Sequence, residues 1–172
     1  MSVPERFAPQ EEENESGGHS LEPMHFSDLP EVLVIERACF SDPWPEFAFV
    51  QGLSCADCYS RVTRKNGQVS GYLIGYVSSL EIHIANVAVS PAFRRQGVAR
   101  RLMLDVLEGT NLRCTSAVLD VRESNHPAIR LYLSLGFRPI GRRPRYYRHP
   151  VEDAIVMTTK CRTPRKNARE RD

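Results

Sequence analysis

The stretch Asn86-Val-Ala-Val-Ser-Pro-Ala-Phe-Arg-Arg-Gln-Gly-Val-Ala-Arg-Arg101 decides the fold of this chain. A strand rich in β-branched residues is followed by a proline, a short basic loop and an amphipathic helical pattern. A helix that begins there presents free N–H groups and partial positive charge, which is what a phosphate group requires. Gly97 lets the backbone approach a ligand closely, and Arg94, Arg95 and Arg100 add positive charge. From the residues alone, a plain strand–loop–helix with surface arginines is an equal alternative to a phosphate site.

Periodicity and turn signals outside this stretch predict two helices, then antiparallel strands, then strands alternating with helices. Asn66-Gly67 is a strong hairpin turn signal, and Asp28 is expected to cap the first helix with Glu31 completing a capping box. This order predicts a mixed α/β sandwich with helices packed on the sheet. The expected helices begin at Asp28, run through Phe47 to Gln51, span Val98–Glu108 and run from Asn125 to Gly136; the expected strands lie within Arg61–Val77 and over Glu81–Val89, Ala117–Arg122, Phe137–Ile140 and Ala154–Thr158.

Length and composition predict one ordered globular domain with two tails. The chain has 172 residues, of which 41% are hydrophobic and 26% charged, and its net charge of +2 does not indicate a nucleic-acid partner. Residues 1–22 are rich in glutamate and residues 161–172 in arginine and lysine. Neither segment shows apolar periodicity, so both are expected to be disordered around an ordered domain at 23–160. The basic tail could contact RNA or a ribosome, although a solvated terminus is the simpler expectation.

The cysteines and the hydropathy pattern bear on compartment and cofactors. No signal peptide and no apolar run long enough to span a membrane is evident, which predicts a cytoplasmic protein, and a monomer is expected. The five cysteines fit a reducing compartment. Cys55 and Cys58 form a C-x-x-C, but no second pair or histidine cluster accompanies them, so no metal is expected. No direct nucleic-acid site is indicated.

The loop sequence Arg94-x-x-Gly97-x-Ala99 resembles the signature of the GNAT acetyltransferases, in which this loop binds the pyrophosphate of acetyl-CoA. Further motifs between His25 and Thr158 resemble one subfamily, the bacterial ribosomal-protein-alanine N-acetyltransferases (RimI-like). These motifs are Ala38-Cys-Phe-x-x-Pro-Trp44, Glu81-x-His83-Ile-x-Asn86, Leu119-x-Val-Arg-x-Ser-Asn125, Ala128-Ile-x-Leu-Tyr132, Leu135-Gly-Phe137, Tyr146-Tyr147 and Glu152-Asp-Ala-Ile155. The resemblance implies the GNAT fold: a mixed, mostly antiparallel central sheet, splayed at the acetyl-CoA site, with helices on both faces.

The resemblance also implies a site for acetyl-CoA as co-substrate. In the family, the strand before the loop offers backbone groups to the pantetheine arm, and one N–H polarises the thioester carbonyl as in an oxyanion hole. Asn125 is implied to contact the cofactor and is also a good helix N-cap. The implied cofactor-binding residues are Val87, Ala88, Val89, Arg95, Gln96, Gly97, Val98, Ala99, Arg100 and Asn125.

The catalytic base departs from the family pattern. The family has a glutamate on the strand before the Asn-capped helix, whereas this sequence has Asp120, one methylene shorter. A peptide α-amino group has a pKa near 8, so the base has modest work to do. A lone carboxylate among apolar strand neighbours is either functional or paired, with Arg122 or Arg100 as the expected partner. His83, on a strand among isoleucines, is expected to be a core histidine, and a role as alternative base stays open.

The proton donor and the acceptor-binding residues are implied in the same way. Tyr132 matches the family's general acid, which protonates the departing CoA thiolate, although its helix face also predicts a core aromatic. Phe40 and Trp44 lie where the family recognises the acceptor peptide, and Tyr146 and Tyr147 are expected in a loop that faces them.

The implied function is acetylation of a protein α-amino group, with the N-terminal alanine of a ribosomal protein as the family substrate. Two alternatives remain at this stage. One is a GNAT enzyme that acetylates lysine side chains or small amines. The other is a non-catalytic CoA-binding module associated with ribosomes.

Overall fold

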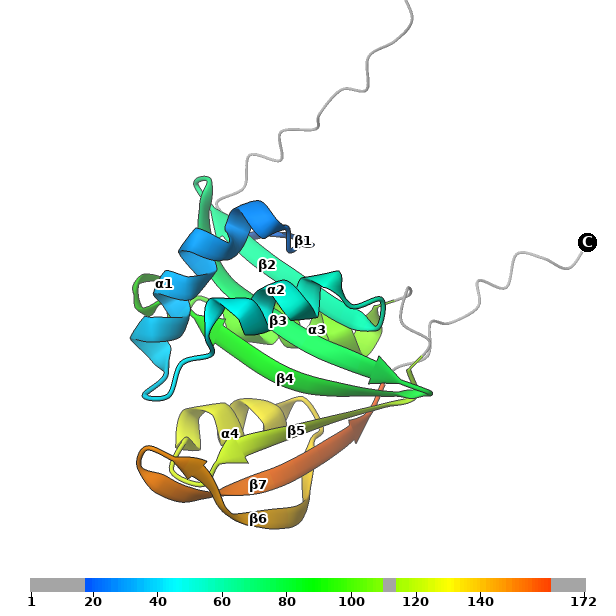
Figure 1. Ribbon diagram of the computed structural model, residues 1–172. Helices are drawn as coiled ribbons and strands as arrows, with labels where there is room; N and C mark the ends of the chain where they lie inside the picture. Colours follow the sequence, from blue (N-terminus) through cyan, green and yellow to red (C-terminus); the bar gives the residue numbers. More distant parts are fainter. Residues whose placement is uncertain (1–17, 110–113, 162–172) are drawn as a thin grey trace, which may run out of the picture.

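The computed structural model describes residues 18–109 and 114–161; the predicted tails lie outside this part except for residues 18–22 and 161. A seven-stranded sheet in the order β1-β2-β3-β4-β5-β7-β6 runs through the molecule (Figure 1). All neighbouring strands are antiparallel except β4 and β5. The strands are β1 (Ser20–Pro23), β2 (Cys58–Lys65), β3 (Gln68–Ser78), β4 (Glu81–Val89), β5 (Ser116–Arg122), β6 (Arg138–Arg148) and β7 (Val151–Lys160).

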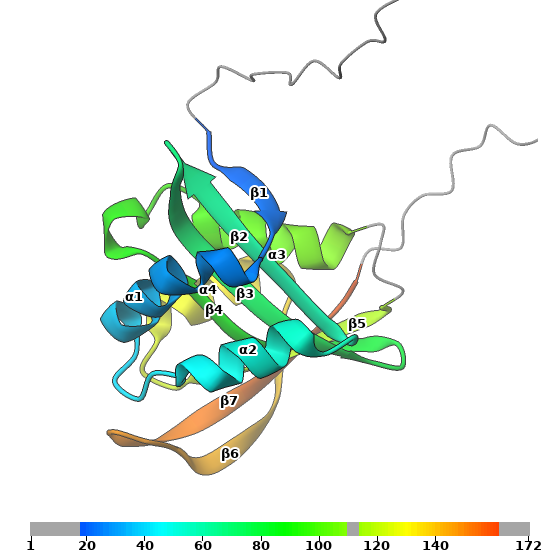
Figure 2. The same ribbon diagram turned by 45° about the horizontal axis from the view of Figure 1, so that its top comes forward.

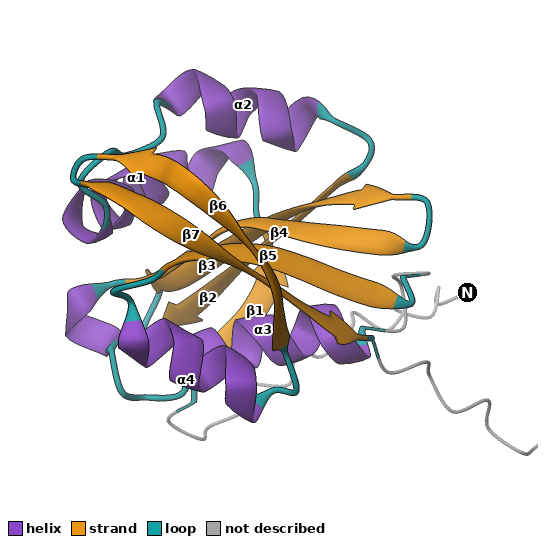
Figure 3. Cartoon of the chain, turned by 90° about the horizontal axis from the view of Figure 1, so that it is seen from below, coloured by secondary structure: helices purple, strands orange, loops and turns teal. Residues whose placement is uncertain are grey.

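Helices cover both faces of the sheet, as the resemblance implied. Figure 3 shows α1 (Leu29–Cys39) and α2 (Glu46–Ser54) on one face, and α3 (Val98–Glu108) and α4 (His126–Ser134) on the other. Short 3₁₀ turns lie before α1, at Phe26–Asp28, and after β4, at Pro91–Phe93. The expectation of a mixed, mostly antiparallel sheet between helices is therefore confirmed.

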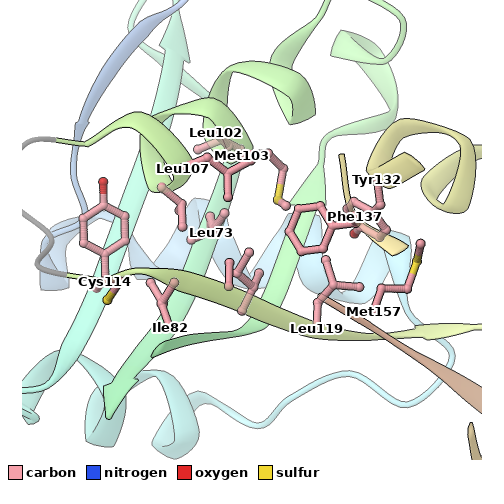
Figure 4. Packing of buried hydrophobic residues seen from close by; sticks show 14 of the residues in the cluster. Leu73, Ile82, Leu102, Met103, Leu107, Cys114, Leu119, Tyr132, Phe137 and Met157 are labelled. Carbon is pink, nitrogen blue, oxygen red and sulfur yellow. The ribbon is translucent and has the colours of Figure 1, made fainter. Parts of the chain in front are cut away.

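The two layers of helices bury two separate clusters of apolar side chains. The cluster under α3 and α4 includes Leu73, Ile82, Leu102, Leu119 and Met157 (Figure 4). The cluster under α1 and α2 is centred on fully buried aromatic and aliphatic side chains of both helices and strands, among them Val32, Phe49, Val62, Tyr72 and Ile74. Burial of apolar surface on both faces fixes the sheet between the helices.

The parallel strands β4 and β5 pair along only part of their length. Their register runs from Glu81 opposite Ser116 to Ile84 opposite Leu119, although β4 continues to Val89 and β5 to Arg122. Beyond this point the two strands diverge (Figure 1), while β5 stays paired with β7 on its other edge along its whole length. The sheet is therefore splayed, as implied, and the backbone of β4 on its β5 side is left without a strand partner from residue 85 onward.

Local signals predicted the central elements correctly and the ends of the sheet less well. Asn66 and Gly67 form the expected turn, with φ of 52° and 79°. Strand β1 was not predicted, and it pairs with β2 at the edge of the sheet (Figure 2). Strands β6 and β7 are longer than expected. The extent of β6 was missed because it is exposed at nearly every position and shows no alternation of apolar residues. Consequently Tyr146 and Tyr147 lie in strand β6, not in the loop that was predicted.

The start of the first helix also differs from the prediction. Asp28 occupies the N-cap position, but its side chain makes no capping hydrogen bond to α1. Instead its carboxylate accepts a hydrogen bond from the backbone N–H of His25 and pairs with Arg64. Glu31 does not close a capping box, since its Oε2 accepts from the N–H of Val69 at 2.9 Å. Both carboxylates therefore bind the β2–β3 hairpin or the preceding turn, contacts that local spacing does not reveal.

Two buried tyrosines predict loss of stability at alkaline pH. Burial is the main cause that raises the pKa of Tyr72 and of Tyr132, and neighbouring Glu36 and Tyr147 add to it respectively. Because the unfolded tyrosines have a pKa near 10, their contribution to stability is complete below about pH 10 and is lost as the pH rises above it. Each should lower the free energy of unfolding by about 1.4 kcal/mol per pH unit in that range. Denaturant unfolding between pH 8 and 11 measures this; a folded protein whose six tyrosines all ionise near pH 10 would contradict it.

Candidate active site

The loop between β4 and α3 forms a cationic hollow at the start of the helix. Gly97 is the N-cap of α3 and has φ of 79°, while Arg95 has φ of 62°. The Oε1 of Gln96 lies 2.9 Å from Nζ of Lys65 and 3.3 Å from Nε2 of His19. The N–H groups of the first helical turn have no partner within the helix, so the hollow suits an anionic ligand. It is lined by Gly18, His19, Lys65, Gln96, Gly97, Val98 and Arg101.

Some of the predicted loop arginines are turned toward other parts of the protein. Arg94 places Nη2 3.5 Å from Sγ of Cys39, and Arg100 donates to Oγ of Ser134 at 3.2 Å. Lys65 and Arg101 line the hollow instead. No local signal indicated Lys65, which reaches Gln96 of the loop from the β2–β3 hairpin, 31 positions away. For Arg101, its place in the first helical turn of a basic segment was the only available signal.

A β-bulge sets which side chains of β4 face which layer. Ile74 pairs with Asn86 and Gly75 with Ile84, so Ala85 is the extra residue. Before the bulge, Ile82 and Ile84 belong to the cluster under α3; after it, Ala88 belongs to the cluster under α1. The inserted residue therefore reverses the alternation of side chains along β4. After the bulge the odd-numbered residues Val87 and Val89 face α3 and pack against the cluster beneath it. The backbone of these residues borders the splay between β4 and β5.

Asn125 acts as the helix cap that its position predicted. Its Oδ1 accepts a hydrogen bond from the N–H of Ala128 at 3.3 Å at the start of α4, and its side chain is exposed. A capping side chain keeps its second oxygen lone pair and its amide group available. The predicted cofactor contact is therefore compatible with the cap.

Asp120 lies between a histidine and an arginine. Its Oδ2 is 3.2 Å from Nε2 of His83 on β4, and its Oδ1 accepts from Nε of Arg143 on β6 at 2.9 Å. The Asp120 side chain is 7% exposed, whereas that of His83 is 43% exposed. The expected partners were wrong, since Arg122 pairs with Glu152 and Arg100 bonds Ser134.

His83 is thus not the core histidine that its apolar neighbours suggested. It lies on β4 where pairing with β5 is ending, and its ring is open to solvent on one side. A buried carboxylate that accepts from one ring nitrogen orients the imidazole and leaves the other ring nitrogen available. The pair can therefore accept a proton from a group that approaches His83.

Tyr147 flanks the pair, and Tyr132 lies near Tyr147 in the layer of α4. Tyr132 on α4 is buried and packs on Phe137 with ring centroids 5.8 Å apart, and its hydroxyl makes no hydrogen bond to any described residue. Burial raises the pKa of Tyr132, so its hydroxyl stays protonated at neutral pH. Tyr147 on β6 directs its hydroxyl to the backbone oxygen of Asp120 at 3.4 Å. Burial also raises the pKa of Tyr147, to about 12.

The loop between α1 and α2 lies beside the tip of the β6–β7 hairpin (Figures 1 and 3). The loop carries Phe40, which is 36% exposed, and Trp44, which is half-buried. The α1–α2 loop and the β6–β7 hairpin form two adjoining walls. Ser41 joins them by donating a hydrogen bond from its Oγ to the backbone oxygen of His149. The exposed Tyr146 and the half-buried Tyr147 meet edge to face on the hairpin, with centroids 5.1 Å apart. Structure therefore brings the four predicted acceptor residues onto two adjoining walls.

Arg122, which was expected to pair with Asp120, contacts both of these walls instead. Its guanidinium donates to the backbone oxygens of His149 and Pro150 at 3.2 Å, approaches Oγ of Ser41 at 3.4 Å, and lies 4.1 Å from the ring centre of Tyr147. It also pairs with Glu152. One side chain on β5 thus holds both acceptor walls.

Replacing Arg122 by lysine should loosen the acceptor walls without affecting the cofactor loop. Lysine keeps the charge but cannot place several donors in fixed directions, so we expect KM for a peptide acceptor to rise about tenfold. The KM for acetyl-CoA should change little. Steady-state kinetics with each substrate varied in turn measures both constants, and equal rises in the two would show that the substitution acts on the whole fold.

Three comparisons with known proteins find relatives of this chain. Residues 29–137 match the family model of the acetyltransferase (GNAT) family. The ribosomal protein bS18-alanine N-acetyltransferase of Escherichia coli K12 is 33% identical over 144 residues, which cover 81% of this chain and 95% of that protein. The N-alpha-acetyltransferase RimI of Mycobacterium tuberculosis H37Rv is 34% identical over 120 residues, 67% of this chain and 75% of the relative. The crystal structure of the Escherichia coli enzyme superposes with a TM-score of 0.76 at 31% identity, covering 87% of this chain and 98% of that one.

A splayed sheet with a cationic loop at a helix N-terminus defines a class of enzymes that bind an acyl-CoA. The chain belongs to the acetyltransferase (GNAT) family. It is an acyltransferase that uses acetyl-CoA as co-substrate. Within residues 18–109 and 114–161, no helix is long and apolar enough to cross a membrane, and no cluster of three or more histidine, cysteine or acidic side chains could hold a metal ion.

Proposed function

We propose that the chain transfers the acetyl group of acetyl-CoA to the α-amino group of a protein, with the N-terminal alanine of a ribosomal protein as the acceptor. The names of the Escherichia coli and Mycobacterium tuberculosis relatives support this acceptor class. The observation that carries the proposal is the His83–Asp120 pair, which lies at the splay beside the two acceptor walls. A peptide held between those walls has its terminal amine near a base and near the cofactor strand.

In this proposal Asp120 and His83 act together as the base. The amine nitrogen forms a bond to the thioester carbon, the carbon–sulfur bond breaks, and one amine proton passes to His83, directly or through a water molecule. Asp120 orients the imidazole and stabilises its charge, while Arg143 offsets the charge of the carboxylate. The backbone N–H groups of Val87, Ala88 and Val89 are the candidates that polarise the thioester carbonyl.

The ordinary pKa values of amines favour an α-amino acceptor over lysine. An α-amino group has a pKa near 8, so part of it is neutral at cellular pH, whereas a lysine side chain has a pKa near 10.4. Acetylation of lysine would require the base to act on an amine that is almost entirely protonated. The solvent-open His83 suits the easier reaction.

Acetylation of matched peptides tests the proposal. One peptide carries a free N-terminal alanine and no lysine; the other is blocked at its N-terminus and carries an internal lysine. Release of free CoA thiol should follow addition of the first peptide and be slow with the second. Reaction with the lysine peptide alone would favour a lysine acetyltransferase, and binding of acetyl-CoA without turnover on peptides or small amines would favour a non-catalytic module.

In the same proposal, Gly97 and its neighbours hold the pyrophosphate of acetyl-CoA. Tyr132 is the proposed donor of a proton to the departing thiolate. Replacing Tyr132 by phenylalanine should lower kcat about tenfold, less than the roughly 10²–10⁴-fold typical of general acids, because a thiolate leaves readily. The buried ring keeps its packing on Phe137 in this variant, so stability should change little. Single-turnover acetyl transfer compares the two proteins; an unchanged rate would leave Tyr132 as a core aromatic only.

A further inference from the structure

Glu36 on α1 is a buried carboxylate that the proposed chemistry does not use. It is 1% exposed, and no cationic side chain among the described residues pairs with it. Burial of a carboxylate is costly unless hydrogen bonds compensate. Its Oε1 accepts from the N–H of Trp44 at 2.7 Å, and its Oε2 accepts from the hydroxyl of Tyr72 and from Nδ2 of Asn86 at 3.1 Å.

The same residue holds both ends of the acceptor loop. The backbone oxygen of Glu36 accepts from the N–H of Phe40 at 3.0 Å, where α1 ends. Its carboxylate holds the N–H of Trp44 four residues further on. The Phe40–Trp44 segment is therefore held at its start by the backbone carbonyl of Glu36 and at its end by the carboxylate of Glu36.

The other two donors connect this loop to the cofactor strand. Asn86 lies on β4 directly after the bulge and directly before Val87, where the splay borders the strand. Tyr72 lies on β3 opposite Ala88, and its hydroxyl is 3.3 Å from Oδ1 of Asn86. A single carboxylate thus fixes the distance between the acceptor wall and the strand that borders the acetyl-CoA site.

We infer that Glu36 is a positioning residue for the acceptor peptide. It acts through the Phe40–Trp44 loop, which it holds at a fixed place relative to β4. The role in binding the acceptor peptide rests on the proposed function, whereas the holding of the Phe40–Trp44 loop by Glu36 does not. In Glu36→Gln the side chain keeps its volume, while one acceptor oxygen becomes a donor. At least one of the three donors that converge on it then loses its acceptor.

Trp44 makes the loop directly observable, because it is the chain's single tryptophan. Its ring meets that of Phe49 with centroids 5.7 Å apart. In Glu36→Gln we expect lower anisotropy and a red-shifted emission of Trp44 in the protein without substrates. The dissociation constant of an Ala-initiated peptide, measured by Trp44 emission with CoA present, should rise about tenfold, in line with loss of one charge-assisted hydrogen bond. The KM for acetyl-CoA should stay within about twofold of wild type.

Thr63→Val is the matched control, since it removes buried hydrogen bonds of the same sheet away from the loop. Thr63 donates to the backbone oxygen of Gly71 and accepts from Ser70. If Glu36→Gln lowers the melting temperature as Thr63→Val does but leaves Trp44 emission and peptide affinity unchanged, Glu36 is only structural and the inference is wrong. Tyr72→Phe removes one donor and serves if Glu36→Gln does not fold; it should weaken peptide binding in the same direction. Turnover is not needed for these measurements, so an inactive wild type would refute the proposed function alone.

Discussion

Asp120→Asn should lower kcat for acetylation of a free peptide N-terminus about 10²–10³-fold, in the lower half of the roughly 10²–10⁴-fold range typical of general-base catalysis. Asparagine fits the same space but cannot stabilise a protonated imidazole, and it leaves Arg143 without its carboxylate. The KM for acetyl-CoA should change little, because the phosphate loop lies on another segment of the chain. His83→Gln should lower kcat to a similar extent, since the two side chains act as one unit.

Glu81→Gln is the control for this pair. Glu81 lies on the same strand as His83, is exposed, and accepts a hydrogen bond from Oγ of Ser116. It should retain the wild-type rate. Retention of most activity in Asp120→Asn would remove Asp120 from the mechanism, while loss in His83→Gln alone would assign the base to His83.

Gly97→Ala should raise KM for acetyl-CoA about 10–100-fold, because the added methyl group keeps a phosphate from the N–H groups at the start of α3 and each charge-assisted hydrogen bond contributes about 1.5–3 kcal/mol. Gly67→Ala is an unusually close control. Both glycines have φ of 79°, and a Cβ on either would meet no atom of the described residues within 4 Å. The backbone strain, about 1–2 kcal/mol, should therefore be the same in both variants.

The difference between these two glycine variants isolates the ligand. Equal losses of thermal stability are expected, together with weakened acetyl-CoA binding in Gly97→Ala only. Isothermal titration with CoA measures the affinity without turnover. Equal affinities of the two variants for CoA would show that the loop at Gly97 does not hold the cofactor.

Contiguous sequence signals predicted the centre of this molecule. The strand, basic loop and helix of residues 86–101 carry their pattern within sixteen positions, and Asn66-Gly67 needs no distant partner to form its turn. The signature of the loop and the motifs around it also led to the family, which the comparisons show. Features of this kind depend on local backbone preference, which is readable from neighbouring residues.

Features that depend on distant partners were missed. Strand β1 pairs with β2, from Ser20 opposite Arg64 to Pro23 opposite Arg61, far along the chain, and strand β6 gains no burial that would mark it. The partner of Asp120 is Arg143 on a strand that was expected to be a loop at that point, and His83 was assigned to the core because its neighbours are isoleucines. The network around Glu36 joins an α1 side chain to β3 and β4, and no local spacing indicates it. Tertiary pairing decides such contacts.

One measurement tests the acceptor most directly: the position of the acetyl group on a peptide that offers both a free N-terminal alanine and an internal lysine. The two amines then compete in one molecule at equal concentration, and fragment masses locate the product. We expect the acetyl group on the α-nitrogen, at a rate that Asp120→Asn reduces. Acetylation of the lysine side chain at the expense of the terminus would contradict the account.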